Sequence, residues 1–553
     1  MWDSSSTIYV GGYSERGERV NAVVIIGAGL AGLSAALALA ENGRRVRLVS
    51  AQPSERAQSV LAAGGFNAAA DTMGENDTTE LHYEDTMRGG VYLADPNAVD
   101  GLTRSAPRLL DELISLGVPF NMRNGRPALR NFGGQKKKRT AYSKSSTGKM
   151  IMTAIIDKVR KYEAAGLVKR YPHHEFVRLM IHGGRCEGAV IYDTFSGKCL
   201  ALCGAVILCC GGMNGLFPGM TTGTTQNSGS VQARLFSQGV DMANLEMIQY
   251  HPTTVGISGK RCLVSEAARG EGGRLFIKCG GENRYFMEEK YPELKNLMPR
   301  DVVSREMYFV RREPGCEGEV YLDMTGLSDD IWNSRLSDLR SELKEQLGID
   351  PAEKPIPVRE GIHYFMGGIY VDEAHRTSIR GVYAAGESAC QYHGANRLGG
   401  NSMLGAVYGG KIAAGTVMKE YADNGAAEYG EAVTDDTFSE LSPVVSERVG
   451  AVLIGAMGIV RSEHRLENAL DELSVLEREY RLNDIDRARM LLARAMLLSA
   501  LERRESRGAH FREDYPEQDE AYRKTLRASA ADGSVSLRFE DIPDRRETNG
   551  DKA

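Results

Sequence analysis

A strand–turn–helix–strand segment near the N-terminus restricts the fold of this chain more than any other feature. Residues 22–26 read AVVII, an apolar run that predicts a short buried strand. The run leads into Gly27-Ala28-Gly29-Leu30-Ala31-Gly32 and then into an Ala/Leu-rich helix ending near Asn42, and residues 45–50 predict the next strand. A G-x-G-x-x-G turn in this position lets backbone N–H groups approach a pyrophosphate at the helix N-terminus. The segment therefore predicts a βαβ dinucleotide-binding unit.

The second strand of this unit ends at Ser50, where Asp or Glu commonly binds a ribose hydroxyl. We therefore expect the cofactor site to lack the usual acidic contact at this position.

A second cofactor segment lies far downstream. Residues 381–387 (GVYAAGE) have the form of a late FAD-binding strand, and residues 394–402 (GANRLGGNS) precede a small-residue helix expected from Met403 to about Ala422. Glu387 suits a ribityl or ribose hydroxyl, and the helix start at Ser402 favours an anionic reduced flavin through its dipole. Two such segments around a long insert predict a discontinuous FAD domain with a cap.

The length of 553 residues predicts two to four domains. We expect an α/β fold: a discontinuous Rossmann-like FAD-binding domain with an inserted α+β capping domain and a C-terminal helical domain. Leucines at 466, 470, 473 and 476 recur at helical spacing and indicate the helical domain. The expected ranges are 1–244 and 362–423 for the FAD domain, 245–361 for the cap, 424–531 for the helical domain, and 532–553 for a strand and polar tail.

Charge and cysteine usage exclude several classes of protein. The formal net charge of −6 argues against nucleic-acid binding. The nine cysteines form no C-x-x-C pair, so we expect no disulfide scaffold, no zinc or iron–sulfur site, and unpaired thiols in a reducing compartment.

The sequence predicts neither a signal peptide nor a membrane span. The first 20 residues lack a basic region followed by an apolar one. Residues 22–40 are uncharged and long enough to cross a bilayer, but the glycine turn inside them is better explained by cofactor binding. We expect a cytoplasmic protein, peripheral on the membrane only through partner subunits.

Eight motifs occur in a fixed order and together identify a family. They are FGGQ (132–135), TGK (147–149), YHPTT (250–254), SEAARGEGG (265–273), PRDVVSRE (299–306), HYFMGGI (363–369), GANRLGGNS (394–402) and ESRGAH (505–510). From about residue 20 to 540 the chain resembles the flavoprotein subunit of the succinate dehydrogenase/fumarate reductase family. The resemblance implies the domain order given above and an FAD-dependent enzyme.

A fumarate or succinate site needs cationic or hydrogen-bonding groups at both carboxylates. Arg397 offers a planar fork for one carboxylate, while histidine and serine side chains can add further hydrogen bonds. The resemblance assigns substrate binding to His251, Ser265, His363, Arg397, Gly65 and Phe120, with Ser265 where the family commonly has Thr.

The reaction also needs a proton donor opposite the flavin. By resemblance this is Arg300, although a guanidinium normally stays protonated. Glu266 and Arg269 are spaced i, i+3 and share one face of a helical turn. We expect Arg269, Glu266 and Arg300 to form a cation–anion–cation path that replaces the proton.

The resemblance also implies a set of FAD contacts and no metal ligand. The contacts are Gly27, Ala28, Gly29, Gly32, Ser50, Ser59, Gly64, Gly65, Lys144, Thr147, Gly148, Glu387, Arg397, Ser402 and Met403.

Three departures from the family pattern concern the flavin. Gln58 stands where the family has the histidine that bonds covalently to flavin, and an amide nitrogen is not a competent nucleophile. Residues 62–65 read AAGG instead of AQGG or AEGG, and residues 228–231 read SGSV instead of TGDG. We therefore expect non-covalent FAD and a flavin poised toward fumarate reduction.

Three functions remain open at this point. The first is fumarate/succinate redox with electrons exchanged through a separate iron–sulfur subunit, with a membrane anchor or quinone-reactive subunit in the same complex. The second is an L-aspartate oxidase, although the loop 121–135 has no acidic residue for an ammonium group. The third is a non-catalytic flavin-binding assembly protein. A basic cluster at 123–139 suits either a solvated loop or an acidic partner.

Overall fold

The structure is a computed structural model that describes residues 22–144, 146–257, 259–421 and 431–546. Parts of three predictions lie outside these ranges. They are the N-terminal stretch expected to lack a signal peptide, Ala422 at the expected end of the second cofactor helix, and the last seven residues of the expected polar tail.

A five-stranded parallel sheet forms the centre of the FAD-binding region. Its order is β21 (Val382–Ala384), β12 (Val206–Leu208), β1 (Val23–Ile26), β2 (Val46–Ser50) and β8 (Val168–Pro172). In register, Val24 lies opposite Val206 on one side and Arg47 on the other. All five strands are parallel, so the strands of the two cofactor segments end at the same edge of the sheet, where ligands of such sheets bind.

Helices from both cofactor segments pack against each other beside this sheet. The α1 helix (Leu30–Glu41) contacts α10 (Asn401–Glu420) and α4 (Thr147–Ala164), while α3 (Pro96–Ser115) contacts α10 and α2 (Thr79–Gly89). The predicted strand–helix–strand unit and the predicted downstream strand and helix are therefore confirmed, to within one or two residues at their ends.

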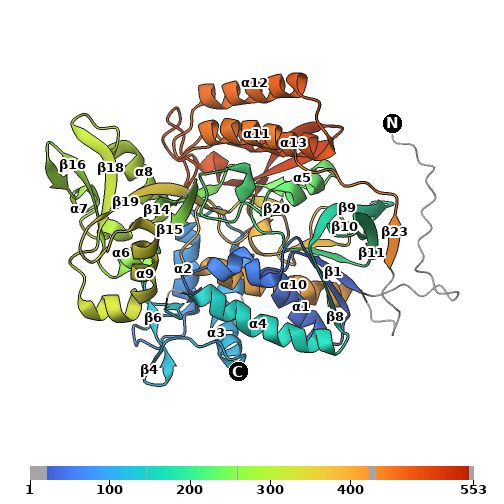
Figure 1. Cartoon of the computed structure of the whole chain (residues 1–553), viewed down its shortest axis with the longest axis horizontal. Coiled ribbons are helices and arrows are strands. Elements are labelled where there is room, and N and C mark those ends of the chain that lie inside the picture. The colour runs from blue at the N-terminus through green and yellow to red at the C-terminus, as the bar shows by residue number, and fades with distance from the viewer. Residues whose placement is uncertain (1–21, 145, 258, 422–430, 547–553) are drawn as a thin grey trace.

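An antiparallel sheet extends the FAD-binding region on the right of Figure 1. It contains β9 (His174–His182), β10 (Arg185–Asp193), β11 (Lys198–Cys203) and β23 (Glu431–Thr434). Because β23 pairs with β11, the chain returns to this sheet before its C-terminal helices begin.

The capping region lies on the left of Figure 1, around a six-stranded antiparallel sheet. Its strands are β15 (Lys260–Leu263), β14 (Ile248–Ile257), β19 (Ile356–Phe365), β18 (Cys316–Asp323), β16 (Arg274–Cys279) and β17 (Glu282–Arg284). Its helices are α6 (Ala267–Gly270), α7 (Phe286–Lys290), α8 (Arg300–Val310) and α9 (Ser337–Leu347). Their apolar side chains form a core of their own, separate from the FAD-binding core.

Two cysteines of the capping region correct the expectation of unpaired thiols. Cys279 and Cys316 form a disulfide, with Cα atoms 4.0 Å apart. They are separated by 37 residues and become neighbours only because β16 and β18 place them opposite each other. No local spacing reveals such a pair, and the cysteine argument for a reducing compartment does not hold for it.

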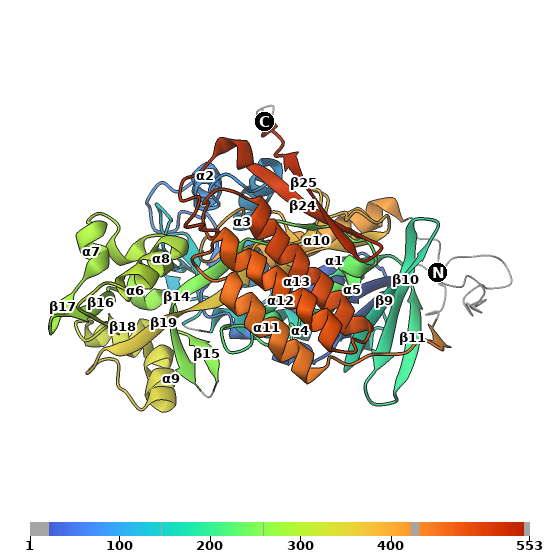
Figure 2. The same cartoon turned by 90° about the horizontal axis from the view of Figure 1, so that it is seen from above.

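Three helices lie side by side over the FAD-binding region, as Figure 2 shows from above. They are α11 (Pro443–Ala456), α12 (Glu463–Glu479) and α13 (Asp484–Glu502). Ser442 caps α11 and Asn483 caps α13, while Leu466, Leu473 and Leu476 are buried under α12. The predicted helical run is confirmed.

The C-terminal strand forms a hairpin rather than standing alone. β24 (Lys524–Ala531) and β25 (Ser534–Asp541) join a sheet with β13 (Met242–Ala243), β20 (Gly368–Tyr370) and β22 (Ala389–Cys390).

The remaining elements are small. Three short strands form one sheet: β3 (Phe66–Asn67), β6 (Leu129–Arg130) and β7 (Thr140–Ala141). A hairpin consists of β4 (Met122–Arg123) and β5 (Arg126–Pro127), and α5 (Ser230–Ser237) packs on β9. Among the described residues, no helix is long and apolar enough to cross a membrane.

Candidate active site

One cavity of about 1240 Å³ connects the FAD-binding and capping regions. Its wall includes the β1–α1 turn, the start of α10, and residues of β14, β19 and α8. This volume exceeds the usual range of roughly 300–1,000 Å³ for small-ligand pockets, so it has room for a dinucleotide together with a small substrate.

The glycine turn is shaped for close backbone approach. Gly27 has φ +112°, and a Cβ added there would lie 2.0 Å from the carbonyl oxygen of Cys209. Gly29 precedes α1 without a side-chain cap, while Leu30 N donates to Ser59 Oγ at 3.1 Å. Gly32 does not line the cavity, because it packs against the carbonyl of Gly27. The turn and the open helix start fit the pyrophosphate of FAD.

Most of the other predicted FAD contacts also line the cavity. They are Ala28, Ser50, Ser59, Gly64, Gly65, Glu387, Arg397, Ser402 and Met403. Lys144, Thr147 and Gly148 do not: Thr147 Oγ1 accepts from Ser143 N, and Gly148 N donates to Ala62 O. Of these three predicted contacts, Gly148 supports the segment 58–62 from behind the wall, whereas the Lys144 side chain is exposed and its N–H donates to Asn121 Oδ1.

Glu387 lines the cavity beside the end of β19. Its Oε1 accepts a hydrogen bond from Phe365 N at 3.1 Å. Burial raises its pKa to about 7, against the opposing effects of this hydrogen bond and of Arg397. A carboxyl group in this state can accept a hydrogen bond from a ribityl or ribose hydroxyl.

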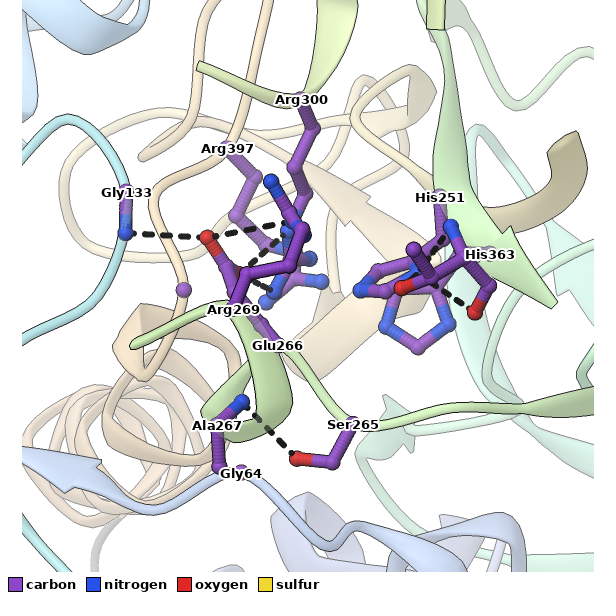
Figure 3. A network of polar contacts seen from close by, with 12 residues as sticks. Gly64, Gly133, His251, Ser265, Glu266, Ala267, Arg269, Arg300, His363 and Arg397 are labelled. Carbon is purple, nitrogen blue, oxygen red and sulfur yellow. Dashed lines mark hydrogen bonds and ion pairs between the residues drawn. The ribbon is translucent and has the colours of Figure 1, made fainter. Parts of the chain in front are cut away.

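Glu266 is the centre of a buried charge cluster at the other end of the cavity (Figure 3). Its Oε2 accepts from Arg300 Nε at 2.9 Å and Nη2 at 2.6 Å, and Arg269 Nη2 lies 3.6 Å from Oε1. Gly133 N also donates to Oε1 at 2.9 Å. Although burial opposes it, the charges of Arg300 and Arg269 lower the pKa of Glu266 to about 2, so the group is a carboxylate at neutral pH.

Arg397 completes the cluster from the loop before α10. Its Nη2 donates to Gln249 Oε1 at 3.2 Å, its guanidinium stacks 4.3 Å from the Tyr364 ring, and its Nε has no hydrogen-bond partner among the described residues. Burial and the charge of Arg300 lower its pKa to about 9, which leaves it protonated at pH 7. Three buried guanidinium groups thus lie near one carboxylate, which among the described residues pairs with Arg300 and Arg269 only, and the positively charged site is complementary to a dianion.

Two neutral histidines lie beside these cations. The rings of His251 on β14 and His363 on β19 are 5.1 Å apart. Burial and the charge of Arg300 hold the pKa of each well below its usual value. Thr222 Oγ1 lies 2.8 Å from His363 Nδ1; when the hydroxyl donates to Nδ1, the ring keeps its own hydrogen on Nε2 as a donor to the cavity.

The structure brings together all predicted substrate residues except one. Ser265 and Gly65 line the cavity with His251, His363 and Arg397. Phe120 instead packs in the core of the FAD-binding region, where its apolar ring is 5% exposed, and it does not line the cavity. Phe132 of the FGGQ motif lines the cavity, next to the glycine that binds Glu266.

Sequence reasoning missed four further residues of this wall or its support: Phe132, Thr222, Gln249 and Tyr364. Gln249 lies two residues before His251 on β14, and Tyr364 follows His363, so proximity to the motif histidines was an available signal. Thr222 had no such signal, because it meets His363 only through the fold.

Gln58 also lines the cavity, and its side-chain oxygen accepts a hydrogen bond from Thr224 N at 2.7 Å. The residue thereby ties the segment 58–62 to the loop before α5. No group of three His, Cys, Asp or Glu side chains placed to hold a metal ion occurs among the described residues.

Comparisons with known proteins cover nearly the whole chain. A family model described as FAD binding domain matches residues 22–403, and one described as Fumarate reductase flavoprotein C-term matches residues 487–548. The succinate dehydrogenase flavoprotein subunit of Bacillus subtilis is 34% identical over 562 residues, which cover 94% of this chain and 96% of that protein.

Two further matches differ in their stated activity. An L-aspartate oxidase of Pyrococcus furiosus is 35% identical over 505 residues, which cover 91% of this chain and 97% of that protein. A variant of E. coli quinol fumarate reductase has a TM-score of 0.82 at 28% identity, covering 97% of this chain and 99% of that one. The predicted α/β architecture and the assignment to FAD-dependent oxidoreductases are confirmed.

Proposed function

This chain belongs to the succinate dehydrogenase/fumarate reductase family of FAD-dependent flavoproteins, and on that premise we propose that it interconverts fumarate and succinate. The observation that carries the proposal is the excess of two positive charges among Arg269, Arg300, Arg397 and Glu266 inside one enclosed site. A dicarboxylate compensates this excess, whereas a neutral or singly charged ligand does not.

FAD held by the β1–α1 turn, Glu387 and the start of α10 would supply hydride chemistry at the flavin N5 atom. In our proposal Arg397, His251, His363 and Ser265 hold the two carboxylates, so the reacting carbons lie beside Arg300. Neutral histidines with N–H donors suit this role because they add hydrogen bonds without further charge.

We propose that Arg300 donates the proton to the second carbon. Its Nη1 donates to Gln249 Oε1 at 3.0 Å, while Nε and Nη2 are held by Glu266, so the guanidinium cannot rotate freely. Glu266, a carboxylate at rest, then takes up a proton from Arg269 and passes it to Arg300, and Arg269 regains a proton from outside the cluster. Arg269, the outermost residue of this path, is held in place by a hydrogen bond of 2.6 Å from its Nη1 to Asn296 O.

The similarity to an L-aspartate oxidase makes the choice of substrate a specific question. An amino acid needs a carboxylate for its ammonium group. Glu266 is already compensated by two arginines, and the apolar Phe132 lies on the same wall. Titrating the enzyme while following flavin absorbance should show binding of fumarate and succinate at least tenfold tighter than that of L-aspartate; tighter binding of L-aspartate would contradict the proposal.

We further propose that FAD is held without a covalent bond and that the enzyme favours fumarate reduction. Gln58 offers an amide engaged with Thr224 instead of a nucleophile. Covalent attachment at the 8α position withdraws electron density from the flavin, so a flavin without it is the stronger reductant.

Electron exchange through a separate iron–sulfur subunit is also part of the proposal, with a membrane anchor or quinone-reactive subunit in the same complex. The Bacillus subtilis relative is named a flavoprotein subunit, which supports assembly with other chains. Isolation of the native complex and identification of its chains tests this: an iron–sulfur protein at equal stoichiometry is expected, and a catalytically complete single chain would contradict it.

A further inference from the structure

The N-terminus of α10 has open backbone amides although an asparagine stands at its first position. Gly400 precedes the helix with φ +85° and no side-chain cap, and Asn401 N donates to Leu398 O. Ser402 N and Met403 N make no hydrogen bond to another described residue, and both residues line the cavity. An asparagine side chain can bond the N–H two residues ahead, which here is Met403 N, and such a bond from Asn401 would close this end of the helix.

The side chain of Asn401 is instead held away from its own helix. Its Oδ1 accepts from Asn67 Nδ2 at 2.7 Å and lies 3.0 Å from His82 Nε2, while its Nδ2 donates to Thr86 Oγ1 at 3.0 Å. All four side chains are at most 2% exposed, so no water competes for these bonds.

The direction of each hydrogen bond in this group is determined. Thr86 Oγ1 donates to His82 O at 2.8 Å, so it must accept from Asn401, and this fixes the orientation of the Asn401 amide. Thr140 Oγ1 likewise donates to Asn67 Oδ1, which leaves Asn67 Nδ2 as the donor to Asn401. Oδ1 of Asn401 therefore faces two donors, one of them His82.

His82 must therefore carry its hydrogen on Nε2. Burial and the charge of Arg139 lower its pKa to about 3, so the ring is neutral and has a single N–H. Its Nδ1 has no hydrogen-bond partner among the described residues. Burying a histidine ring with one nitrogen unpaired costs free energy. The hydrogen bond from His82 Nε2 to Asn401 Oδ1 is therefore the interaction that offsets the burial of this polar ring.

The same loop also carries Arg397, which lies four residues before Asn401 and has an unpartnered Nε in the cavity at 3% exposure. Gln135 Nε2 and Asn67 Nδ2 both donate to Gly399 O at 2.8 Å, and a Cβ at Gly400 would lie 2.1 Å from Asn67. The loop from Arg397 to Asn401 is thus held rigidly between the two parts of the cavity.

We infer that His82 and Asn67 are positioning residues for the flavin: they sequester the Asn401 side chain, so that the amides of Ser402 and Met403 stay open to the electron-rich edge of the cofactor. This rests on the proposed placement of FAD in the cavity. The free amides and the positive end of α10 stabilise negative charge on the reduced flavin. A side-chain cap in the same place would compete with the cofactor for these donors.

The test uses the full chain with FAD and needs no dicarboxylate. His82→Phe removes the donor, frees Asn401 to cap the helix, and should weaken FAD binding by about tenfold, the scale of one cap. The midpoint potential of the bound flavin should fall in the same variant. His82→Gln, which keeps an N–H donor, should restore both properties in large part.

A double variant separates this role from general support of the fold. In His82→Phe/Asn401→Leu no side chain can cap α10, so FAD affinity and potential should recover relative to His82→Phe alone. A double variant that binds FAD as weakly as the single one or more weakly, or an unchanged potential in His82→Phe, overturns the inference. If His82→Phe does not fold, Thr86→Val takes its place, because it removes the acceptor for Asn401 Nδ2. Thr86→Val should likewise weaken FAD binding and lower the midpoint potential, and an unchanged potential would overturn the inference. Loss of fumarate turnover alone concerns the proposed function, because affinity and potential are measured without substrate.

Discussion

Two nitrogens of Arg300, Nε and Nη2, donate to a single oxygen of Glu266, at 2.9 and 2.6 Å, and the two side chains are only 8% and 2% exposed. The third guanidinium nitrogen, Nη1, donates to Gln249. The guanidinium of Arg300 is therefore held by hydrogen bonds at all three of its nitrogens, while its face lies on the cavity wall. Glu266, which passes the next proton to Arg300 in the proposed path, is already in contact with it.

Replacement of Arg300 should abolish turnover without loss of FAD. Arg300→Ala removes the group that delivers the proton, so fumarate reduction should fall by about 100- to 10,000-fold, the usual contribution of a general acid. Arg300→Lys restores charge without the fork geometry and should recover only a little. Arg312→Ala, at an exposed site just after the same helix, is the matched control. Turnover by Arg300→Ala within tenfold of wild type would remove Arg300 from catalysis.

The Glu266 carboxylate should also make stability depend on acid pH. Its pKa in the folded protein, about 2, lies below the ordinary 4.5, so its stabilising effect is present above pH 4.5 and is lost as the pH falls toward 2. The difference in unfolding free energy between wild type and Glu266→Gln should therefore shrink between about pH 5 and pH 3. Urea unfolding at several pH values measures it, and a constant difference would contradict the assigned charge state.

The two histidines should bind substrate in their neutral form. Because burial and the charge of Arg300 hold the pKa of both well below 6.5, kcat/KM for fumarate should show no histidine titration between about pH 6 and 8. Thr222→Val removes the hydroxyl that holds Nδ1 of His363 and should raise KM for fumarate by about tenfold with a smaller change in kcat. A histidine-like step in the pH profile of wild type, or an unchanged KM in the variant, would argue against this tautomer.

FAD should be released when the protein is denatured. Since Gln58 cannot form the 8α bond, acid precipitation should leave the yellow colour in the supernatant. Flavin that stays with the pellet and fluoresces on a denaturing gel would refute non-covalent binding. The predicted direction is checked separately with dyes of matched driving force, where succinate oxidation faster than fumarate reduction would contradict it.

Local patterns predicted the cofactor-binding part of the molecule well. The strand at 23–26, the glycine turn and α1 depend on contiguous residues, and the downstream strand and α10 carry an equally local signal. The parallel register that makes these segments neighbours follows from the general behaviour of βαβ units.

Contacts between distant segments could not be predicted in the same way. The Cys279–Cys316 disulfide depends on the register of β16 and β18, and the pairing of Thr222 with His363 depends on how a loop crosses β19. Phe120 and Phe132 lie only twelve residues apart in the sequence, yet only Phe132 reaches the cavity. The motif that contains Phe132 was the better guide to the site.

The central claim, that the arginine-rich site acts on a dicarboxylate, is tested most directly by an anaerobic assay with reduced viologen. The account predicts fumarate-dependent oxidation of the dye, lost in Arg300→Ala, and no peroxide formation from L-aspartate in air. Aspartate-dependent peroxide formation without fumarate-dependent dye oxidation would contradict the account, as would silence toward both substrates in protein that carries its full complement of FAD.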